Sequence, residues 1–235
     1  MARIRNRPKF TKPKRVLLFA TYNVLLALLL FVSFELILRL NGVRPWRKQE
    51  VHIQVNPGGT FFVKHPVFGY THIPGKFVVT LATGYSFNVA HLPNTLRVTR
   101  PFDSYKEARQ KEEIWIFGCS FTHGWSVNDE ETYPWLLQER FPNYEVVNFG
   151  VSGYGTIQSL MQFKNELEMR RPKVAVLAYG GFHDQRNTFL RSRRKIIAAW
   201  NKLGPLGQPE ARLDGDSNLR YSISQGEYSE FPLMG

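Results

Sequence analysis

Three segments of the chain place small and polar residues directly after apolar runs. Gly118, Cys119 and Ser120 follow EIWIF, Gly153 comes soon after YEVVNFG, and His183 comes soon after KVAVLAYGG. If the three runs are parallel strands, their carboxyl ends meet at one edge of a sheet, where open α/β sheets form ligand crevices. We therefore expect these residues to share one crevice.

The residue types at the three ends are those that acyl transfer requires, namely a nucleophile and donors for a developing oxyanion. Ser120 is the candidate nucleophile. Its backbone N–H lies near a predicted helix start, where free amides favour negative charge. Gly153 allows close approach of the backbone to a substrate because it has no Cβ. His183 can donate an imidazole N–H.

The elements between these ends indicate how the residues are positioned. Residues 113–118, 144–150 and 173–181 read as buried strands, and residues 130–140 and 156–170 read as helices, with Pro134 in a first turn. Apolar strands that alternate with helices predict a parallel sheet with helices on its faces and right-handed crossovers.

The N-terminal region predicts a membrane anchor. Seven of the 31 Lys and Arg residues lie in positions 1–15, and residues 16–34 carry no charge. These basic residues contribute much of the net charge of +12, and they lie directly beside the apolar segment. Because the charge is explained by a membrane-flanking position, we expect no nucleic-acid partner. A bilayer core requires roughly 20 apolar helical residues, which residues 16–40 supply. A buried core helix is the alternative.

The flanking charges also predict an orientation. The basic N-terminus is expected to stay cytoplasmic, with the remainder exported across the inner (cytoplasmic) membrane in a single-pass topology. The run is longer than the apolar region of a cleavable signal peptide, and no A-x-A-like site follows it. We therefore expect an uncleaved signal anchor at residues 16–40.

Between the anchor and residue 112 the sequence is rich in Gly, Pro, Val and aromatic residues, which predicts a linker and a small β-rich lead-in. His65, His72 and His91 lie there and read as ordinary loop histidines. No spacing resembles a zinc site, so we expect no metal and no cofactor. Cys119 is the only cysteine, which excludes an intramolecular disulfide.

The blocks GCSFTHGWSVNDEETYPWLL, VVNFGVSGYGT and VLAYGGFHDQRN resemble the SGNH (GDSL-like) hydrolases over roughly residues 113–187. The anchor and HPVFGYTHIPG resemble membrane-anchored members. The resemblance implies a flavodoxin-like three-layer α/β/α fold with its C-terminal part missing. It also implies that Ser120 is the nucleophile and that Ser120, Gly153 and His183 form the oxyanion hole.

The sequence departs from the family pattern at three places. Cys119 stands where the first block usually has Asp, and His183 stands where the third block usually has Asn. The family's late Asp-x-x-His block is absent, so no catalytic His or Asp is assigned and the chain reads as truncated. His123 is a candidate for a substitute base because it lies three residues after Ser120. Asp184 is expected to hold its loop.

These observations define the expected domains and function. The domains are a basic cytoplasmic tail (1–15), the anchor (16–40), the linker and lead-in (41–112) and an incomplete hydrolase-like domain (113–235). We expect a serine esterase that removes an acyl group such as acetyl from a carbohydrate, lipid or other small ester. The alternatives are an O-acyltransferase that acts on an envelope polysaccharide and an inactive protein that binds a glycan or a partner.

Overall fold

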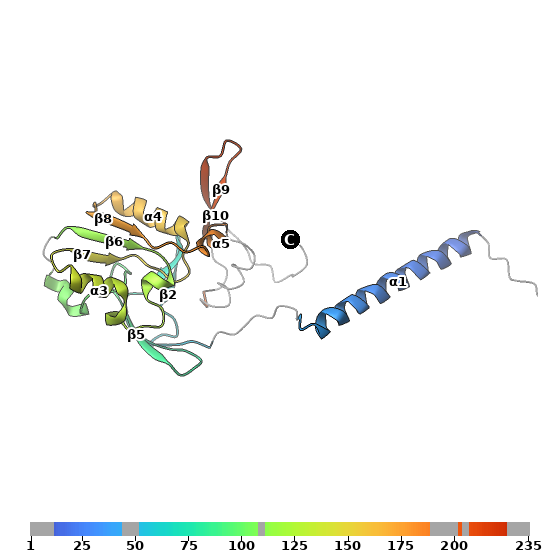
Figure 1. Cartoon of the computed structure of the whole chain (residues 1–235), viewed down its shortest axis with the longest axis horizontal. Helices are drawn as coiled ribbons and strands as arrows, with labels where there is room; N and C mark the ends of the chain where they lie inside the picture. The colour runs from blue at the N-terminus through green and yellow to red at the C-terminus, as the bar shows by residue number, and fades with distance from the viewer. Residues whose placement is uncertain (1–11, 44–51, 108–110, 189–201, 204–206, 225–235) are drawn as a thin grey trace, which may run out of the picture. The chain divides into compact units, whose positions relative to one another are not determined.

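A computed structural model describes residues 12–43, 52–107, 111–188, 202–203 and 207–224 (Figure 1). Most of the basic tail, part of the linker, and the RSRRK and IIAAW segments of residues 191–200 lie outside the described residues. The chain divides into two units, Met1–Arg47 and Lys48–Gly235.

The first unit contains one long helix, α1 (Lys12–Leu40). Its span Pro13–Leu40 has 28 residues with a mean hydropathy of 2.3, and none of its most apolar window is buried. At a rise of 1.5 Å per residue this span is about 42 Å long, which exceeds a hydrocarbon core of about 30 Å. The predicted apolar helix is therefore confirmed, and by length and composition it can cross a membrane.

The second unit is built on a parallel sheet, as the sequence predicts. Strand β6 (Glu113–Phe117) lies between β7 (Glu145–Asn148) and β8 (Val174–Leu177), and it pairs in parallel with both. Because all three strands run in the same direction, their carboxyl ends lie at one edge. The expected α/β fold with a parallel sheet is confirmed.

Helices connect these strands. After β6 the chain forms α2 (Ser120–His123), the 3-10 turn η2 (Asp129–Glu131) and α3 (Tyr133–Arg140), whose first turn contains a proline as expected. Helix α4 (Thr156–Leu167) connects β7 to β8. Figure 1 shows α3 and α4 on opposite sides of the three strands, which is the layered arrangement predicted for this fold class.

An aromatic core holds α4 on the sheet. Its four buried side chains come from β6, β7 and the loop after β7: Trp115, Phe117, Val147 and Phe149. Phe163 and Leu167 of α4 pack against these side chains. The helix ends at Leu167, earlier than the predicted 170.

The lead-in consists of two small antiparallel sheets. One contains β1 (Gln54–Asn56), β4 (Gly75–Thr80) and β5 (Ser86–His91), and the other is the hairpin of β2 (Phe62–His65) and β3 (Gly69–His72). Isolated bridges from His91 to Arg97 and from Arg97 to Asn148 connect β5 to β7. The 3-10 helix η1 (Phe102–Glu107) follows.

Strand β8 differs from the prediction of a buried strand. All four of its residues are exposed, including Val174, Val176 and Leu177 at 43–50%. Among the described residues β8 pairs only with β6, so it is an edge strand with little covering it. Further along the chain, α5 (His183–Asn187) and a hairpin of β9 (Gln208–Leu213) and β10 (Leu219–Ser224) follow.

Candidate functional site

Ser120 is the first residue of α2, immediately after the turn that ends β6. Cys119, not Ser120, occupies the N-cap position, and Cys119 is buried while Ser120 is half-buried. The turn is tight: a Cβ at Gly118 would lie 2.1 Å from Oγ1 of Thr122. Only glycine fits there, and its presence lets α2 begin directly at the end of the strand.

The loop after β7 packs against this turn. The N–H of Val151 donates to the carbonyl of Gly118 at 3.2 Å. A Cβ at Gly150 would lie 2.4 Å from the backbone N of His123, so glycine is required for the close approach of the two segments. Gly153 follows with φ of +94°, in the left-handed region that favours glycine. The second strand end therefore lies beside the first.

The loop after β8 also reaches the same edge. The N–H of Ala178 donates to the carbonyl of Phe117 at 2.9 Å, and the rings of Phe121 and Phe182 stack at 5.8 Å. Arg186 of α5 donates to the carbonyl of Tyr154, in the loop after β7, at 2.8 Å. The three strand ends thus meet at one edge of the sheet, as their parallel order predicts.

His183 is completely buried at the start of α5. The N–H of Gly180 donates to its Nδ1 at 3.5 Å, a long contact that favours the tautomer with the proton on Nε2. The neighbouring Asp184 is exposed and accepts a hydrogen bond from the hydroxyl of Tyr179 at 2.9 Å. This side-chain contact joins the end of β8 to α5.

His123 makes its side-chain contacts with residues other than the candidate nucleophile. It is fully buried, with Nε2 at 3.0 Å from Nε2 of His91 and Nδ1 at 3.4 Å from Oγ of Ser152. Within the described part of the chain, no side chain is hydrogen-bonded to the Ser120 hydroxyl. Both ring nitrogens of His123 therefore have partners other than Ser120.

The interpretation of His65, His72 and His91 as loop histidines is wrong. Each is the last residue of a strand, and His72 and His91 are fully buried. The structure brings His72 and His91 together with His123, with one ligand atom of each within 4.8 Å of the others. A repeated pattern was available in the sequence, since His72 and His91 each precede an aliphatic residue and a proline.

Burial determines the protonation of this cluster. Loss of hydration lowers the pKa of His72 to about 3, and the nearby Arg97 also opposes its positive charge. The pKa values of His91 and His123 are lowered well below their usual range, mainly by burial and then by His72 and Arg97. The three imidazoles are therefore neutral near pH 7.

A pocket of about 350 Å³ lies elsewhere, along β7 and the segment of residues 92–100. Its lining includes Glu113 and Glu145, which begin β6 and β7, together with Arg100 and Arg170, and it does not include Ser120. Arg170 pairs with Glu113 at 2.6 Å across this region. Arg100 pairs with Glu145, so these four charged side chains are paired with one another.

Comparison with known proteins gives a limited similarity. No protein-family model matches the sequence, and no curated protein matches it. Among solved structures, the SGNH-hydrolase family esterase AlinE4 and one of its point variants are 26% identical to this chain, and a second variant is 25% identical. Each overlap covers 39% of this chain and 52% of the esterase, with a TM-score of 0.30. The chain therefore spans about half the length of these esterases.

Proposed function

We propose that this protein is a membrane-anchored, exported serine esterase of the SGNH type, which removes an acyl group such as acetyl from a carbohydrate or lipid. The observation that carries the proposal is the meeting of three parallel strand ends around the start of α2. The contacts from Val151 to Gly118 and from Phe121 to Phe182 support it. Ser120 lies at this meeting point, half-buried and without a bonded side chain among the described residues.

In the proposed reaction, Oγ of Ser120 attacks the ester carbonyl while its proton passes to a base. The carbonyl π electrons move to oxygen, and the N–H groups of Ser120 and Gly153 and the imidazole of His183 donate to this oxyanion. Collapse of the intermediate breaks the bond to the leaving alkoxide, which takes a proton. Water then attacks the acyl-serine, releasing a carboxylic acid and restoring the hydroxyl.

The tautomer of His183 supports its part in this scheme. The contact from the N–H of Gly180 to Nδ1 favours the tautomer of His183 with its proton on Nε2, and a neutral imidazole offers one donor. Loss of one oxyanion donor typically reduces turnover by about 10²–10³-fold. We therefore expect His183→Ala to reduce turnover by this factor, and His183→Asn, which restores an amide donor, to recover part of it.

The proposal is tested with the full chain purified in detergent. A fluorophosphonate probe should label wild-type protein at Ser120, and an aryl acetate should be hydrolysed. Ser120→Ala should abolish both signals, whereas Ser86→Ala, which changes an exposed serine in β5, should leave them unchanged. Undiminished hydrolysis by the Ser120 variant would overturn the assignment.

The orientation of His123 favours a second candidate, an inactive protein that binds a glycan or a partner through the same edge. Both nitrogens of His123 face other residues, so it does not supply a base for Ser120. Absence of covalent labelling at Ser120 in folded protein would support this second function.

A third outcome, transfer of the acyl group to a sugar hydroxyl in place of water, would identify an O-acyltransferase.

The membrane part of the proposal rests on α1. Its apolar span and the basic residues that precede it support a single crossing of the cytoplasmic membrane with the N-terminus in the cytoplasm. Protease added outside intact cells whose outer layers are permeabilised should degrade the second unit and leave the N-terminus protected. Protection of the second unit in this experiment would contradict export.

A further inference from the structure

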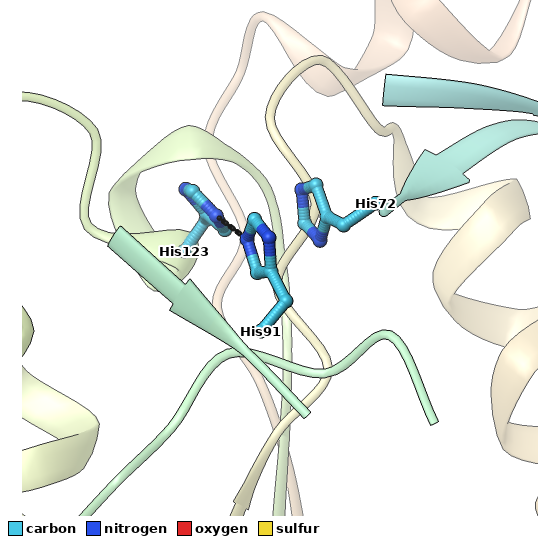
Figure 2. Close-up of side chains that lie close together, drawn as sticks. All are labelled: His72, His91 and His123. Atoms are coloured by element: carbon cyan, nitrogen blue, oxygen red, sulfur yellow. Dashed lines mark hydrogen bonds between the residues drawn. The ribbon is translucent and has the colours of Figure 1, made fainter. Parts of the chain in front are cut away.

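Three histidines from separate parts of the chain meet inside the second unit. His72 ends β3, His91 ends β5 and His123 ends α2, and all three are completely buried. One potential ligand atom from each lies within 4.8 Å of the other two. Figure 2 shows the three rings grouped together, with the bond between His91 and His123 drawn.

The contacts of the Nδ1 atoms leave the Nε2 atoms available. Nδ1 of His72 lies 3.2 Å from the carbonyl of Thr95, and Nδ1 of His91 lies 3.2 Å from the carbonyl of Ile73. A carbonyl can only accept, so in both residues Nδ1 carries the proton and Nε2 presents a lone pair. Carbonyl partners of this kind orient histidines that bind metals in proteins.

His123 is held in a similar way. Its Nδ1 lies 3.4 Å from the hydroxyl of Ser152, and its Nε2 faces Nε2 of His91 at 3.0 Å. Without an ion, Nε2 of His123 must carry a proton to donate to the lone pair of His91. With an ion, the hydroxyl of Ser152 accepts from Nδ1 of His123, and all three Nε2 atoms offer lone pairs.

One buried nitrogen in the cluster has no hydrogen-bond partner. Nε2 of His72 is inaccessible to water and unbonded. Buried polar atoms are nearly always hydrogen-bonded, and an exception calls for a bound group or another explanation. From the convergence of three ring nitrogens and the unbonded Nε2 of His72, we propose that His72, His91 and His123 bind a divalent transition-metal ion, with Zn²⁺ as the expected occupant.

The ligand set and its charge suit such an ion. Imidazole nitrogen is a preferred ligand of Zn²⁺, and the ligands must be neutral, which burial ensures here. Arg97 is the nearby cation that opposes metal binding. It is paired with Asp129 at 2.9 Å and donates to the carbonyl of His123 at 2.6 Å, so its charge is partly compensated.

Binding requires a small rearrangement of the rings. With Zn–N bonds of about 2.0–2.1 Å in a tetrahedral site, the ligand nitrogens lie about 3.4 Å apart. The 3.0 Å pair of His91 and His123 must therefore open slightly. His72 and His91 stack at 4.1 Å with an angle of 2° between their planes, and these rings must turn so that their lone pairs converge.

The ion would have a structural role. It would join β3 and β5 of the lead-in to α2, the helix that begins with Ser120. Three protein ligands leave a fourth position, which water can fill in a tetrahedral site. This inference does not depend on the proposed esterase activity, because its measurements are metal content, spectra and thermal stability.

The experiment uses tag-free full-length chain in detergent, stripped with a chelator and titrated with Zn²⁺ or Co²⁺. We expect one equivalent to bind, Co²⁺ to give the visible absorption of a tetrahedral nitrogen site, and Zn²⁺ at 100 times its Kd to raise Tm by about 5–10 °C. His72→Gln should lower affinity at least tenfold, whereas His52→Gln, at an exposed position, should not change it.

Two results would overturn the proposal. The first is wild-type protein that binds less than a tenth of an equivalent and shows no thermal shift. The second is His72→Gln protein that binds Zn²⁺ as tightly as wild type, which would place the ion elsewhere. If the His72 variant does not fold, X-ray absorption of zinc-loaded wild type decides: three imidazoles at about 2.0 Å support the site, and a spectrum without imidazole scattering rejects it.

Discussion

The rings of Phe121 and Phe182 stack with their centroids 5.8 Å apart. This contact joins the residue after Ser120 to the residue before His183, across two strand ends that are 60 residues apart in the sequence. It is one of the links that bring the loop after β8 to the start of α2. The candidate site therefore depends on contacts between residues of separate sequence motifs.

The stacking predicts an energetic coupling between the two positions. In a double-mutant cycle of Phe121→Ala and Phe182→Ala, we expect a coupling of about 0.5–1 kcal/mol in the free energy of unfolding, because the rings are only partly shielded from water. Chemical denaturation of the four proteins measures it. Strictly additive losses would show that the contact contributes nothing.

Gly150 should tolerate no side chain. In Gly150→Ala the new Cβ would lie 2.4 Å from the backbone N of His123, so α2 must move. We expect a loss of about 1–3 kcal/mol in stability and a fall of roughly 100-fold in labelling of Ser120. Gly215→Ala is the control, because a Cβ at Gly215 meets no atom within 4 Å. Equal behaviour of the two variants would argue against tight packing at α2.

Arg97 and Asp129 form a buried ion pair, and Arg97 also donates to the carbonyl of His123 at the end of α2. The side chain of Arg97 is fully shielded and that of Asp129 is 14% exposed, and their contact is 2.9 Å. Asp129→Ala leaves the guanidinium without its counter-charge, so we expect a loss of about 3–5 kcal/mol in unfolding free energy. Glu112→Ala removes the exposed pair with Lys173 and should be indistinguishable from wild type. Similar effects of the two substitutions would contradict the importance of burial.

The buried histidines predict a loss of stability in acid for metal-free protein. Unfolded histidine takes up a proton near pH 6.5, whereas folded His72 resists protonation until about pH 3, so the unfolded state binds more protons in this interval. The free energy of unfolding should therefore fall by about 1.4 kcal/mol per pH unit for each such histidine. His91 and His123 act in the same direction, and Arg97 and Asp129 are the charged groups beside the cluster.

Urea denaturation at several pH values between 7.5 and 5 measures this dependence. His72→Gln removes one proton-binding group from the unfolded state, so its slope should be smaller than that of wild type by about one proton. A wild-type stability that does not change over this interval would show that the histidines are accessible to protons in the folded protein.

The sequence by itself determined the features that follow from local pattern. The uncharged run of residues 16–34 predicts the apolar helix α1, and the alternation of apolar runs with amphipathic segments predicts β6, α3, β7, α4 and β8 in order. Local composition is sufficient for these elements because length, charge and periodicity decide whether a segment forms a strand or a helix. The order of strands then places Ser120, Gly153 and His183 at strand ends.

Only the tertiary structure decided which distant residues meet and which faces are covered. His72, His91 and His123 lie 19 and 32 residues apart along the chain, and no spacing rule connects them. Their meeting depends on the pairing of β5 through Arg97 with β7 and on the packing of α2 against Gly150. The exposure of β8 likewise depends on its neighbours in the sheet, not on its own apolar residues, because burial is a property of the surroundings that a strand receives.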